Sequence, residues 1–320
     1  MTPGLVGVEI ERVGLCGTDV ELFTGEMAYL SQGVATYPLR IGHEWAGRVT
    51  EVGEGVEPDW IGKRVTCDTM IGCGTCPRCQ RGRKHLCVSR YEIGIRDGWP
   101  GALAERMVAP VGALYEIPGS VSIPAAAMVE PGGNAVRCIR AASLAPGDRL
   151  LVFGPGTIGL LAAQFALTVG AEVQVVGRHE SELKLALSLG VHRVWLVEEL
   201  ESSPHLTFDA VIDATNDPDV PAQSLRRVEP GGRAVFIGLA GRPSMIDSRE
   251  IAFGDVTAVG LLGGSAGIAE AIRRYATGDV VPDSLVAEVI GLDEVASRLE
   301  GVRGSSAGRG PKVHVDPRIG

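Results

Sequence analysis

The stretch DRLLVFGPGTIG, residues 148–159, places a short apolar strand directly before three glycines, and an apolar segment of helix length, residues 160–169, follows it. In such a turn the first glycine permits a tight bend, the second lets the backbone approach a pyrophosphate, and the third lets the helix pack closely. The helix N-terminus then faces the phosphate charge. An ordinary glycine turn is the alternative, but the flanking strand and helix favour a dinucleotide site. Its predicted cofactor contacts are Gly154, Gly156, Thr157, Ile158 and Gly159.

Strand-like and helix-like segments go on alternating after this stretch. Short apolar strands are predicted at residues 172–176, 193–197, 209–213 and 233–238, and helices at 180–189 and 218–228. This alternation favours a parallel sheet covered on both faces, a doubly wound Rossmann α/β domain. We expect Pro230-Gly231-Gly232 to form the turn before the strand at 233–238. The sequence has no Gly-x4-Gly-Lys-Ser/Thr pattern, which disfavours nucleoside triphosphate hydrolysis.

The end of the second strand indicates which dinucleotide binds. An NAD site usually has an acidic residue there to hold the ribose 2′-hydroxyl, but this chain has Val176-Gly177-Arg178-His179. Gly177 leaves room, and the Arg178 guanidinium is suited to a 2′-phosphate. We therefore favour NADP(H) over NAD(H). The alternative is that Arg178 is a solvated charge at a helix start.

The residues before this domain have a different character. Segments rich in β-branched residues, separated by Gly and Pro, predict strands at 5–14, 47–52, 64–67 and 103–108. No long helical pattern occurs before about residue 123. The first 120 or so residues are therefore predicted to form a mostly β domain that carries Cys and His on its loops.

The alternation breaks down after about Gly263. Helical segments are predicted at 268–276 and 293–302, a flexible glycine–serine loop at 304–310 and a terminal strand at 312–315. This tail is too short to form a core alone, so we expect it to pack on the first domain. The predicted division is a discontinuous domain of residues 1–131 and 263–320, interrupted by a dinucleotide-binding domain at 132–262.

Four of the seven cysteines lie together in a segment of about residues 70–90: Cys73, Cys76, Cys79 and Cys87. In a reducing cytoplasm such clustering indicates metal binding rather than disulfides. Four thiolates fill the tetrahedral coordination of zinc and leave no position for substrate, so we predict a structural zinc. An iron–sulfur cluster is the main alternative, because thiolates serve it equally well.

Composition excludes several classes of function. A formal charge of -9 argues against a general nucleic-acid binder, which needs a concentrated basic face. No uninterrupted apolar run approaches the roughly 18 residues of a membrane span. The first residues lack a basic segment followed by an apolar signal core. We expect a cytoplasmic protein without a nucleic-acid or membrane partner.

Two further motifs lie in the predicted β domain, Cys16-Gly-Thr-Asp19 and Gly42-His43-Glu44. With the four cysteines and the glycine turn, they occur in the order found in medium-chain zinc-dependent alcohol dehydrogenases, which this chain resembles over nearly its whole length. Val129-Glu130-Pro131 resembles the Glu-Pro version of the polyol, sorbitol and glucose dehydrogenase branch, in which glutamate replaces a cysteine ligand. The resemblance implies that the β domain is GroES-like and catalytic.

The resemblance also implies the roles of individual residues. Cys16 and His43 would bind a catalytic zinc, with Glu44 and Glu130 as ligands or as neighbours of the ligands. One thiolate, one imidazole and one carboxylate leave zinc an open position for an alcohol or carbonyl oxygen. Thr18 is expected to pass the hydroxyl proton, because its side chain both donates and accepts.

Other residues near these motifs carry further expectations. We expect Asp19 to fix a loop by bonding backbone amides, and Cys67 and Cys138 to be buried and unreactive. Many relatives have a His two residues after the motif aspartate, where this chain has Glu21. The proton would then leave by another route, or Glu21 would meet a cationic or polyhydroxyl substrate. The chain also begins close to the first motif, which either an upstream start codon or a real shortening would explain. A real shortening would leave one strand edge unprotected.

These motifs together predict an oxidoreductase that transfers a hydride between NADP(H) and a secondary alcohol or ketone of a polyol, sugar or cyclitol. Two zinc ions per chain are expected. An NAD-dependent polyol or threonine dehydrogenase is the alternative within the same class. A non-catalytic protein that binds zinc and a dinucleotide is the alternative of another class, although such a binder has no need of an open ligand set.

The surroundings of the site are predicted only coarsely. We expect loops near Tyr29, Trp45, Tyr91 and Trp99 to line the substrate pocket. The apolar strand before Gly263 is expected to pair with its copy across a two-fold axis, as it does in the family. A homodimer or homotetramer follows from such pairing.

Overall fold

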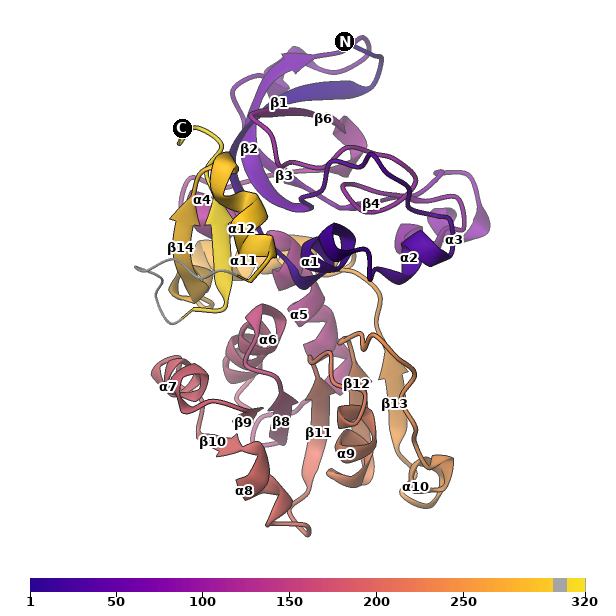
Figure 1. The fold of residues 1–320 in the computed structure, drawn as a ribbon, viewed down its shortest axis with the longest axis vertical. Helices are drawn as coiled ribbons and strands as arrows, with labels where there is room; N and C mark the ends of the chain where they lie inside the picture. Colours follow the sequence, from indigo (N-terminus) through magenta and orange to yellow (C-terminus); the bar gives the residue numbers. More distant parts are fainter. Residues whose placement is uncertain (302–309, 320) are drawn as a thin grey trace.

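The computed structural model describes residues 1–301 and 310–319, and it contains two large sheets. In Figure 1 the sheet that holds both chain termini lies in the upper half, and a second sheet with flanking helices lies in the lower half. Among the described residues, none of the helices has the length and apolar character that crossing a bilayer would require.

The lower sheet is parallel throughout and has the strand order β10-β9-β8-β11-β12-β13. The chain starts at the centre, moves outward on one side and then returns to build the other side. This order is that of a doubly wound Rossmann sheet, as predicted. Its strands are β8 (Arg149–Phe153), β9 (Glu172–Gly177), β10 (Arg193–Leu196), β11 (Phe208–Asp213), β12 (Val228–Phe236) and β13 (Thr257–Gly260).

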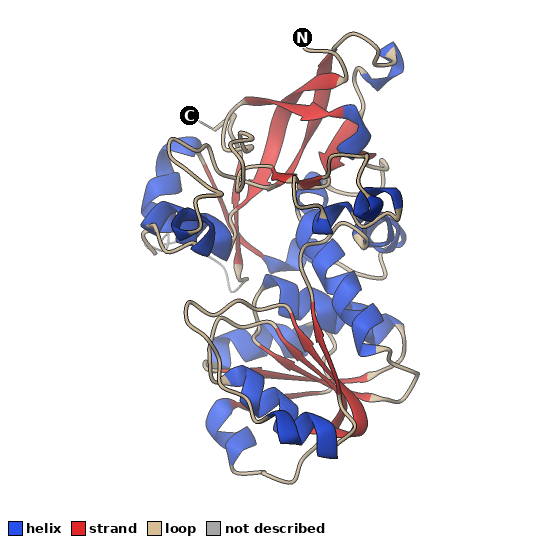
Figure 2. Ribbon diagram, turned by 90° about the vertical axis from the view of Figure 1, so that its right-hand side faces the viewer, coloured by secondary structure: helices blue, strands red, loops and turns tan. Residues whose placement is uncertain are grey.

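Helices lie on both sides of this sheet (Figure 2), and apolar side chains of the strands and helices form its core. Five of them follow strands of the sheet: α6 (Thr157–Thr168), α7 (Glu180–Ser188), α8 (Val197–Glu201), α9 (Val220–Arg226) and α10 (Ser248–Phe253). The predicted strands and helices of this region are confirmed to within a few residues. Helix α10 and the short helix α8 were not predicted.

One predicted turn is wrong. Pro230-Gly231-Gly232 does not precede the fifth strand but lies inside β12, which begins at Val228. The pairing register with β11 shifts opposite this point, and Gly231 has a φ of 80°. A glycine with positive φ permits such an irregularity inside a strand, so the Pro-Gly-Gly sequence here marks an irregular strand rather than a loop.

Helix α5 (Val129–Ala142) carries Glu130 and crosses the predicted domain boundary at 131/132. Its sequence hides the helix, because Pro131 and the pair Gly132-Gly133 are usually read as breakers. Pro131 lies in the first turn, where no backbone N–H is needed. A Cβ on Gly132 would lie 2.2 Å from the Tyr275 hydroxyl, so these glycines permit close packing against α11 (Ile268–Thr277).

The upper sheet has seven strands and is mainly antiparallel, with the order β14-β15-β1-β2-β3-β7 and β6 paired to β1. This confirms the mostly β prediction for the first part of the chain. The strands are β1 (Leu5–Gly14), β2 (Glu44–Val52), β3 (Arg64–Cys67), β6 (Arg106–Pro110), β7 (Leu114–Glu116), β14 (Val286–Ile290) and β15 (Lys312–Val315).

The strand predicted at 103–108 begins later, at Arg106. The residues before it pair with the second motif instead: Ala102 N–H donates to Gly42 O and Leu103 N–H to Ile41 O. Gly101 is tightly enclosed there, since a Cβ would lie 2.3 Å from Ile41 O. This segment therefore supports the His43 loop rather than extending the sheet.

Short elements complete the description. Helices α1 (Gly17–Thr24) and α2 (Ala28–Ser31) follow the first motif, and α4 (Ile123–Ala127) precedes α5. The cysteine segment contains a small two-stranded sheet, β4 (Met70–Ile71) with β5 (Tyr91–Glu92), and helix α3 (Pro77–Gln80). Within residues 1–301 and 310–319, five 3₁₀ turns lie at Pro58–Trp60, Lys84–Leu86, Val111–Ala113, Pro282–Leu285 and Leu292–Glu294.

The C-terminal tail packs back on the first sheet, as expected. β15 pairs antiparallel with β1, where Val13 faces Val315, and β14 pairs with β15. The helix predicted at 293–302 is shorter and consists of α12 (Val295–Leu299) after a 3₁₀ turn. The glycine–serine loop predicted at 304–310 lies, apart from Gly310, outside the described residues. The domain boundaries at 131/132 and 262/263 stay a prediction.

Candidate catalytic metal site and cofactor crevice

The first motif forms the start of helix α1. Cys16 is the residue before the helix, and its backbone N–H donates to Oδ2 of Asp19 at 2.9 Å. A carboxylate that bonds back to the first residue in this way fixes the start of a helix. The Cys16 thiol is thereby held at the helix N-terminus, where the helix dipole favours negative charge.

Asp19 joins this helix to the second motif. Its Oδ1 accepts a hydrogen bond from the Gly42 N–H at 3.1 Å and lies 3.3 Å from Nδ1 of His43. Burial would lower the pKa of His43, but the interactions with Asp19 and Cys16 together outweigh burial and raise it well above its ordinary value. The prediction that Asp19 fixes a loop through backbone amides is confirmed. Its contact with His43 is additional, and such a carboxylate orients a histidine that binds metal through its other nitrogen.

The donor atoms of Cys16, His43 and Glu44 lie within 4.8 Å of one another. A thiolate, an imidazole and a carboxylate together fit zinc, and three protein ligands leave a fourth position open. Bound there, zinc would polarise an alcohol or carbonyl oxygen and stabilise negative charge on it. Thr18 is the second residue of α1 and is partly exposed, and Glu21 lies one turn later on the same helix.

Glu44 has a second partner that comes from the other end of the chain. Its Oε2 accepts a hydrogen bond from Nζ of Lys312 at 2.7 Å, and Lys312 also donates to Leu15 O at 2.8 Å. The two charged side chains are 2% and 3% exposed. Burial would lower the pKa of Lys312, but attraction by Glu44 and Cys16 raises it above its ordinary value. Strand β15 thus completes the site built by the two N-terminal motifs.

Glu130 lies in the first turn of α5, outside the 4.8 Å cluster found among the described residues. Asn134, one helical turn later, donates from Nδ2 to both Glu130 carboxylate oxygens at 3.0 Å. Burial raises the pKa of Glu130 to about 7; His43 opposes this shift, whereas Glu44 adds to it. The carboxylate therefore lies close enough to feel both charges. Its role as a direct ligand stays a prediction.

The four sulfur atoms of Cys73, Cys76, Cys79 and Cys87 lie within 4.8 Å of one another, which fits a tetrathiolate zinc. The Cys76 N–H donates to the Cys73 sulfur at 3.4 Å, a contact that favours a thiolate. A Cβ on Gly72 would lie 2.5 Å from the Cys79 sulfur, so the lobe requires a glycine there. The expectation that Cys67 and Cys138 are buried is confirmed.

The glycine turn after β8 has the three properties that its sequence predicts. Gly154 has a φ of 95°, which favours glycine. A Cβ on Gly156 would meet nothing within 4 Å, so its backbone is open to a ligand. A Cβ on Gly159 would lie 2.0 Å from Gly154 O, so the helix packs tightly on the turn. Thr157 and Ile158 form the first turn of α6. Together they form a cradle that fits a pyrophosphate at a helix N-terminus.

Gly177 and Arg178 lie at the end of β9. A Cβ on Gly177 would lie 2.9 Å from Cγ of Pro155 and 3.0 Å from Cδ2 of Leu183, so a side chain there would crowd the glycine turn. The Arg178 side chain is 63% exposed, and its Nη2 bonds Oδ2 of Asp217 at 2.9 Å. The arginine is therefore accessible to a ligand and already engaged by a carboxylate.

Comparison with known proteins identifies the family. Residues 2–119 match the model of the alcohol dehydrogenase GroES-like domain, and residues 157–277 match that of the zinc-binding dehydrogenases. The L-threonine 3-dehydrogenase of Idiomarina loihiensis is 33% identical over 80% of this chain and 76% of its own length. The chain belongs to the medium-chain zinc-dependent alcohol dehydrogenase family. It is therefore a zinc-dependent NAD(P) dehydrogenase, which excludes the non-catalytic alternative.

Solved structures agree with this family. A zinc-binding dehydrogenase from Sinorhizobium meliloti 1021 with bound NADP is 28% identical, with a TM-score of 0.90 over 99% of this chain and 93% of its own. An alcohol dehydrogenase from E. coli CFT073 with NADH is 25% identical, with a TM-score of 0.87 over the same shares of the two chains. Structures similar to this dehydrogenase thus hold either cofactor.

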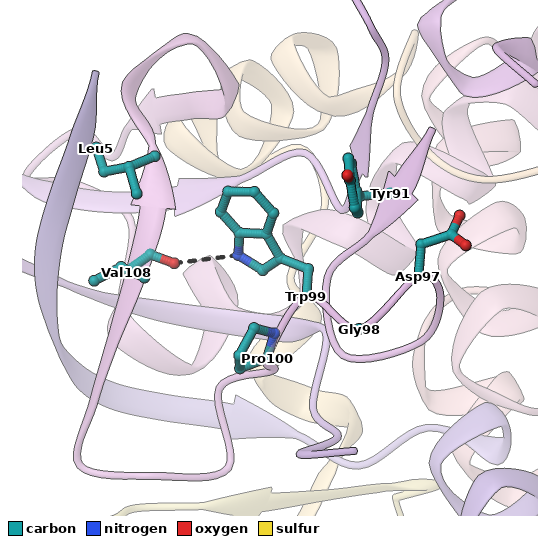
Figure 3. Close-up of a pocket in the computed structure, with 7 residues that line it drawn as sticks. All are labelled: Leu5, Tyr91, Asp97, Gly98, Trp99, Pro100 and Val108. Atoms are coloured by element: carbon teal, nitrogen blue, oxygen red, sulfur yellow. Dashed lines mark hydrogen bonds between the residues drawn. The ribbon is translucent and has the colours of Figure 1, made fainter. Parts of the chain in front are cut away.

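The dehydrogenase's substrate pocket was expected to be lined by loops near four aromatic residues, and some of these residues lie away from the predicted site. Trp45 is 1% exposed, and its side chain packs in the core of the upper sheet rather than facing a pocket. Tyr91 and Trp99 line a surface hollow of about 370 Å³ that contains none of the predicted site residues (Figure 3). There Trp99 Nε1 donates to Val108 O, and its ring packs edge to face with Tyr91. Tyr29 bonds Arg90 and Glu92.

Sequence reasoning missed Lys312, Asn134 and Asp217. Lys312 lies 268 residues after Glu44, and only the pairing of β15 with β1 brings the two together. Asn134 follows Glu130 by four residues, a helical spacing that could have been found had α5 been predicted. The Arg178–Asp217 pair depends on the order of the strands.

Proposed function

We propose that this enzyme interconverts a hydrophilic secondary alcohol and its ketone with NADP(H) as the hydride carrier. A polyol, sugar or cyclitol is the proposed substrate class. The observation that carries the proposal is the open donor set of Cys16, His43 and Glu44, in a chain whose glycine turn also fits a dinucleotide. Glu130 is proposed as a further ligand or a neighbour of the ligands, Thr18 as the group that passes the proton, and the four-cysteine lobe as the site of a second zinc.

Glu21 supports a polar substrate. It occupies the position where many relatives have His, lies three residues after Thr18 on α1 and is half-buried. Residues three apart on a helix share one side, so a carboxylate accompanies the proposed proton-passing hydroxyl. A carboxylate at this place accepts hydrogen bonds from hydroxyl or ammonium groups. It offers nothing to a purely apolar alcohol.

L-Threonine is the second candidate substrate. The observation in its favour is that the Idiomarina loihiensis and Xanthomonas campestris relatives, each 33% identical, are L-threonine 3-dehydrogenases. Threonine carries a secondary hydroxyl beside an ammonium group, so the same carboxylate of Glu21 would serve it. A panel of polyols, sugars, cyclitols and L-threonine, each measured with NADP and NAD, separates the candidates. Turnover of L-threonine alone would overturn the polyol proposal.

The cofactor proposal rests on Arg178. We expect kcat/KM for NADP to exceed that for NAD in the wild-type enzyme, and Arg178→Met to lower kcat/KM for NADP by about tenfold or more while that for NAD changes little. The reason is the loss of charge-assisted bonds to the 2′-phosphate. Lys184→Met is the matched control, because Lys184 is an exposed cation on the neighbouring helix α7. A strong wild-type preference for NAD would contradict the proposal.

We also propose that the enzyme is a homodimer, or a tetramer built from dimers, through the edge strand β13. This strand ends the parallel sheet and is largely exposed. Two large apolar side chains of the segment leading to it, Met245 and Phe253, are 90% and 88% exposed. Light scattering after size-exclusion chromatography is expected to give the mass of two or four chains. A monomer at micromolar concentration would contradict this proposal.

A further inference from the structure

An ion pair spans the place where the cofactor cradle begins. Strands β9 and β11 flank β8 in the parallel sheet, and the glycine turn starts at the end of β8. Arg178 directly follows β9, whereas Asp217 lies in the loop after β11, and their side chains meet at 2.9 Å. Ligands of doubly wound sheets bind outside the carboxyl ends of the strands, in the crevice between these loops. The pair therefore lies at the mouth of the cofactor crevice.

The loop that carries Asp217 is fixed against the glycine turn. A Cβ on Gly154 would lie 2.9 Å from Cγ2 of Thr215, so the loop and the turn are in contact. The Thr215 hydroxyl donates to Asp213 at 2.8 Å and accepts from the Asp217 N–H at 3.3 Å. Oδ1 of Asp217 accepts from the Asp219 N–H at 3.0 Å. One carboxylate oxygen is thus held by the backbone, and the other remains for Arg178.

The two members of the pair differ in freedom. The Arg178 side chain is 63% exposed, but that of Asp217 is only 31% exposed. The long, exposed side chain of an arginine can turn toward another anion. The short carboxylate of Asp217 stays in place, because the Asp219 N–H donates to one of its oxygens and the Asp217 N–H donates to the Thr215 hydroxyl. An ion pair this exposed contributes little stability and is readily exchanged.

We propose that Asp217 is a specificity-determining residue that competes with the cofactor's 2′-phosphate for Arg178. This inference rests on the proposed use of NADP(H). To bind the phosphate, the guanidinium must leave the carboxylate, and the phosphate then binds near a fixed negative charge. Both effects weaken the binding of NADP(H). NAD(H) has no 2′-phosphate, and its ribose 2′-hydroxyl can donate a hydrogen bond to a carboxylate, so Asp217 does not weaken its binding.

Asp217→Asn tests this role with little change of shape. The amide oxygen still accepts from the Asp219 N–H, so the loop is preserved while the charge is removed. On the zinc-loaded enzyme we expect the dissociation constant of NADPH, followed by nicotinamide fluorescence, to fall about two- to fivefold, the size expected for an exposed ion pair. The dissociation constant of NADH should stay the same or rise.

Asp219→Asn is the matched control. Asp219 lies two residues away, its side chain is 76% exposed, and its nearest cation is Arg242 at 3.8 Å rather than Arg178. Asp219→Asn removes one negative charge from the same loop as Asp217→Asn does, so a general electrostatic effect would appear in both variants. An equal gain of NADPH affinity in the two variants would overturn a specific role for Asp217.

The Arg178→Met background separates this inference from the proposed function. If Asp217 acts through the guanidinium, Asp217→Asn should improve NADPH binding less in Arg178→Met than in the wild type. An undiminished effect overturns the competition. If Arg178→Met weakens NADPH binding but Asp217→Asn leaves that binding unchanged, only the role of Asp217 fails. If Arg178→Met leaves NADPH binding unchanged, the proposed 2′-phosphate site fails instead.

Discussion

The Cys16→Ala variant is expected to bind one zinc per chain instead of two and to lose turnover by about 10³-fold or more. The thiolate is one of three donor atoms within 4.8 Å, and it is the one held at a helix N-terminus. Zinc at such a site supplies several kcal/mol of stabilisation to the charge that develops on the substrate oxygen, and each ~1.4 kcal/mol is tenfold in rate. Metal analysis together with kcat/KM measures both losses.

Cys73→Ala is the control that makes this result specific. Like Cys16→Ala, it removes one thiolate and is expected to release one zinc. The thiolate that it removes is one of the four in the four-cysteine lobe, so the zinc is lost from that lobe. Because a closed tetrathiolate site contributes to folding rather than to chemistry, this variant should unfold more easily yet keep measurable turnover while folded. The two variants thus lose equal amounts of metal with different consequences. Cys16→Ala with both metal and activity retained would contradict the catalytic assignment.

A part of the site can be predicted from the sequence when the residues that form it lie close together in the chain. The glycine turn is local: strand, three glycines and helix lie within some twenty residues, and each glycine has the surroundings that its position predicts. The four cysteines are equally local, and their sulfur atoms meet as expected. Motifs of this kind carry their own geometry, because short loops leave few ways to arrange the ligands.

Contacts made across the sheets follow from strand order, and the sequence does not reveal strand order directly. Lys312 reaches Glu44 only because the last strand pairs beside the first. Trp45 looks like a pocket residue beside His43, yet alternation along β2 directs it into the core. Helix α5 was hidden because its glycines are explained by packing against α11 rather than by local propensity. In each case the tertiary contact decides what the local pattern leaves open.

Lys312→Met is expected to destabilise the zinc-depleted protein by about 3–5 kcal/mol, the range for breaking one side of a buried ion pair. The Lys312–Glu44 contact is 2.7 Å long, and both side chains are almost fully enclosed. Removing the ammonium leaves the Glu44 carboxylate buried without its partner, and Leu15 O loses a donor as well. Urea unfolding of the wild type and the variant measures the difference.

The double variant Lys312→Met with Glu44→Gln is the necessary companion, because it removes the charge that the single change leaves uncompensated. Its stability should recover by about 2 kcal/mol or more relative to Lys312→Met, a coupling expected of groups in direct contact. Full additivity of the two changes would show that the pair contributes no coupling energy.

The same measurements with zinc present bear on the open role of Glu44. Bound zinc would be a second cation near this carboxylate, since the donor atoms of Cys16 and His43 lie within 4.8 Å of the Glu44 oxygen. If Glu44 serves as a ligand, bound zinc compensates its charge, and Lys312→Met should destabilise the loaded protein less than the depleted one. If Glu44 interacts with Lys312 and not with the metal, Lys312→Met should destabilise the zinc-loaded and the zinc-depleted protein equally. Glu130, held by Asn134 outside the cluster, would then be the carboxylate that remains for the metal.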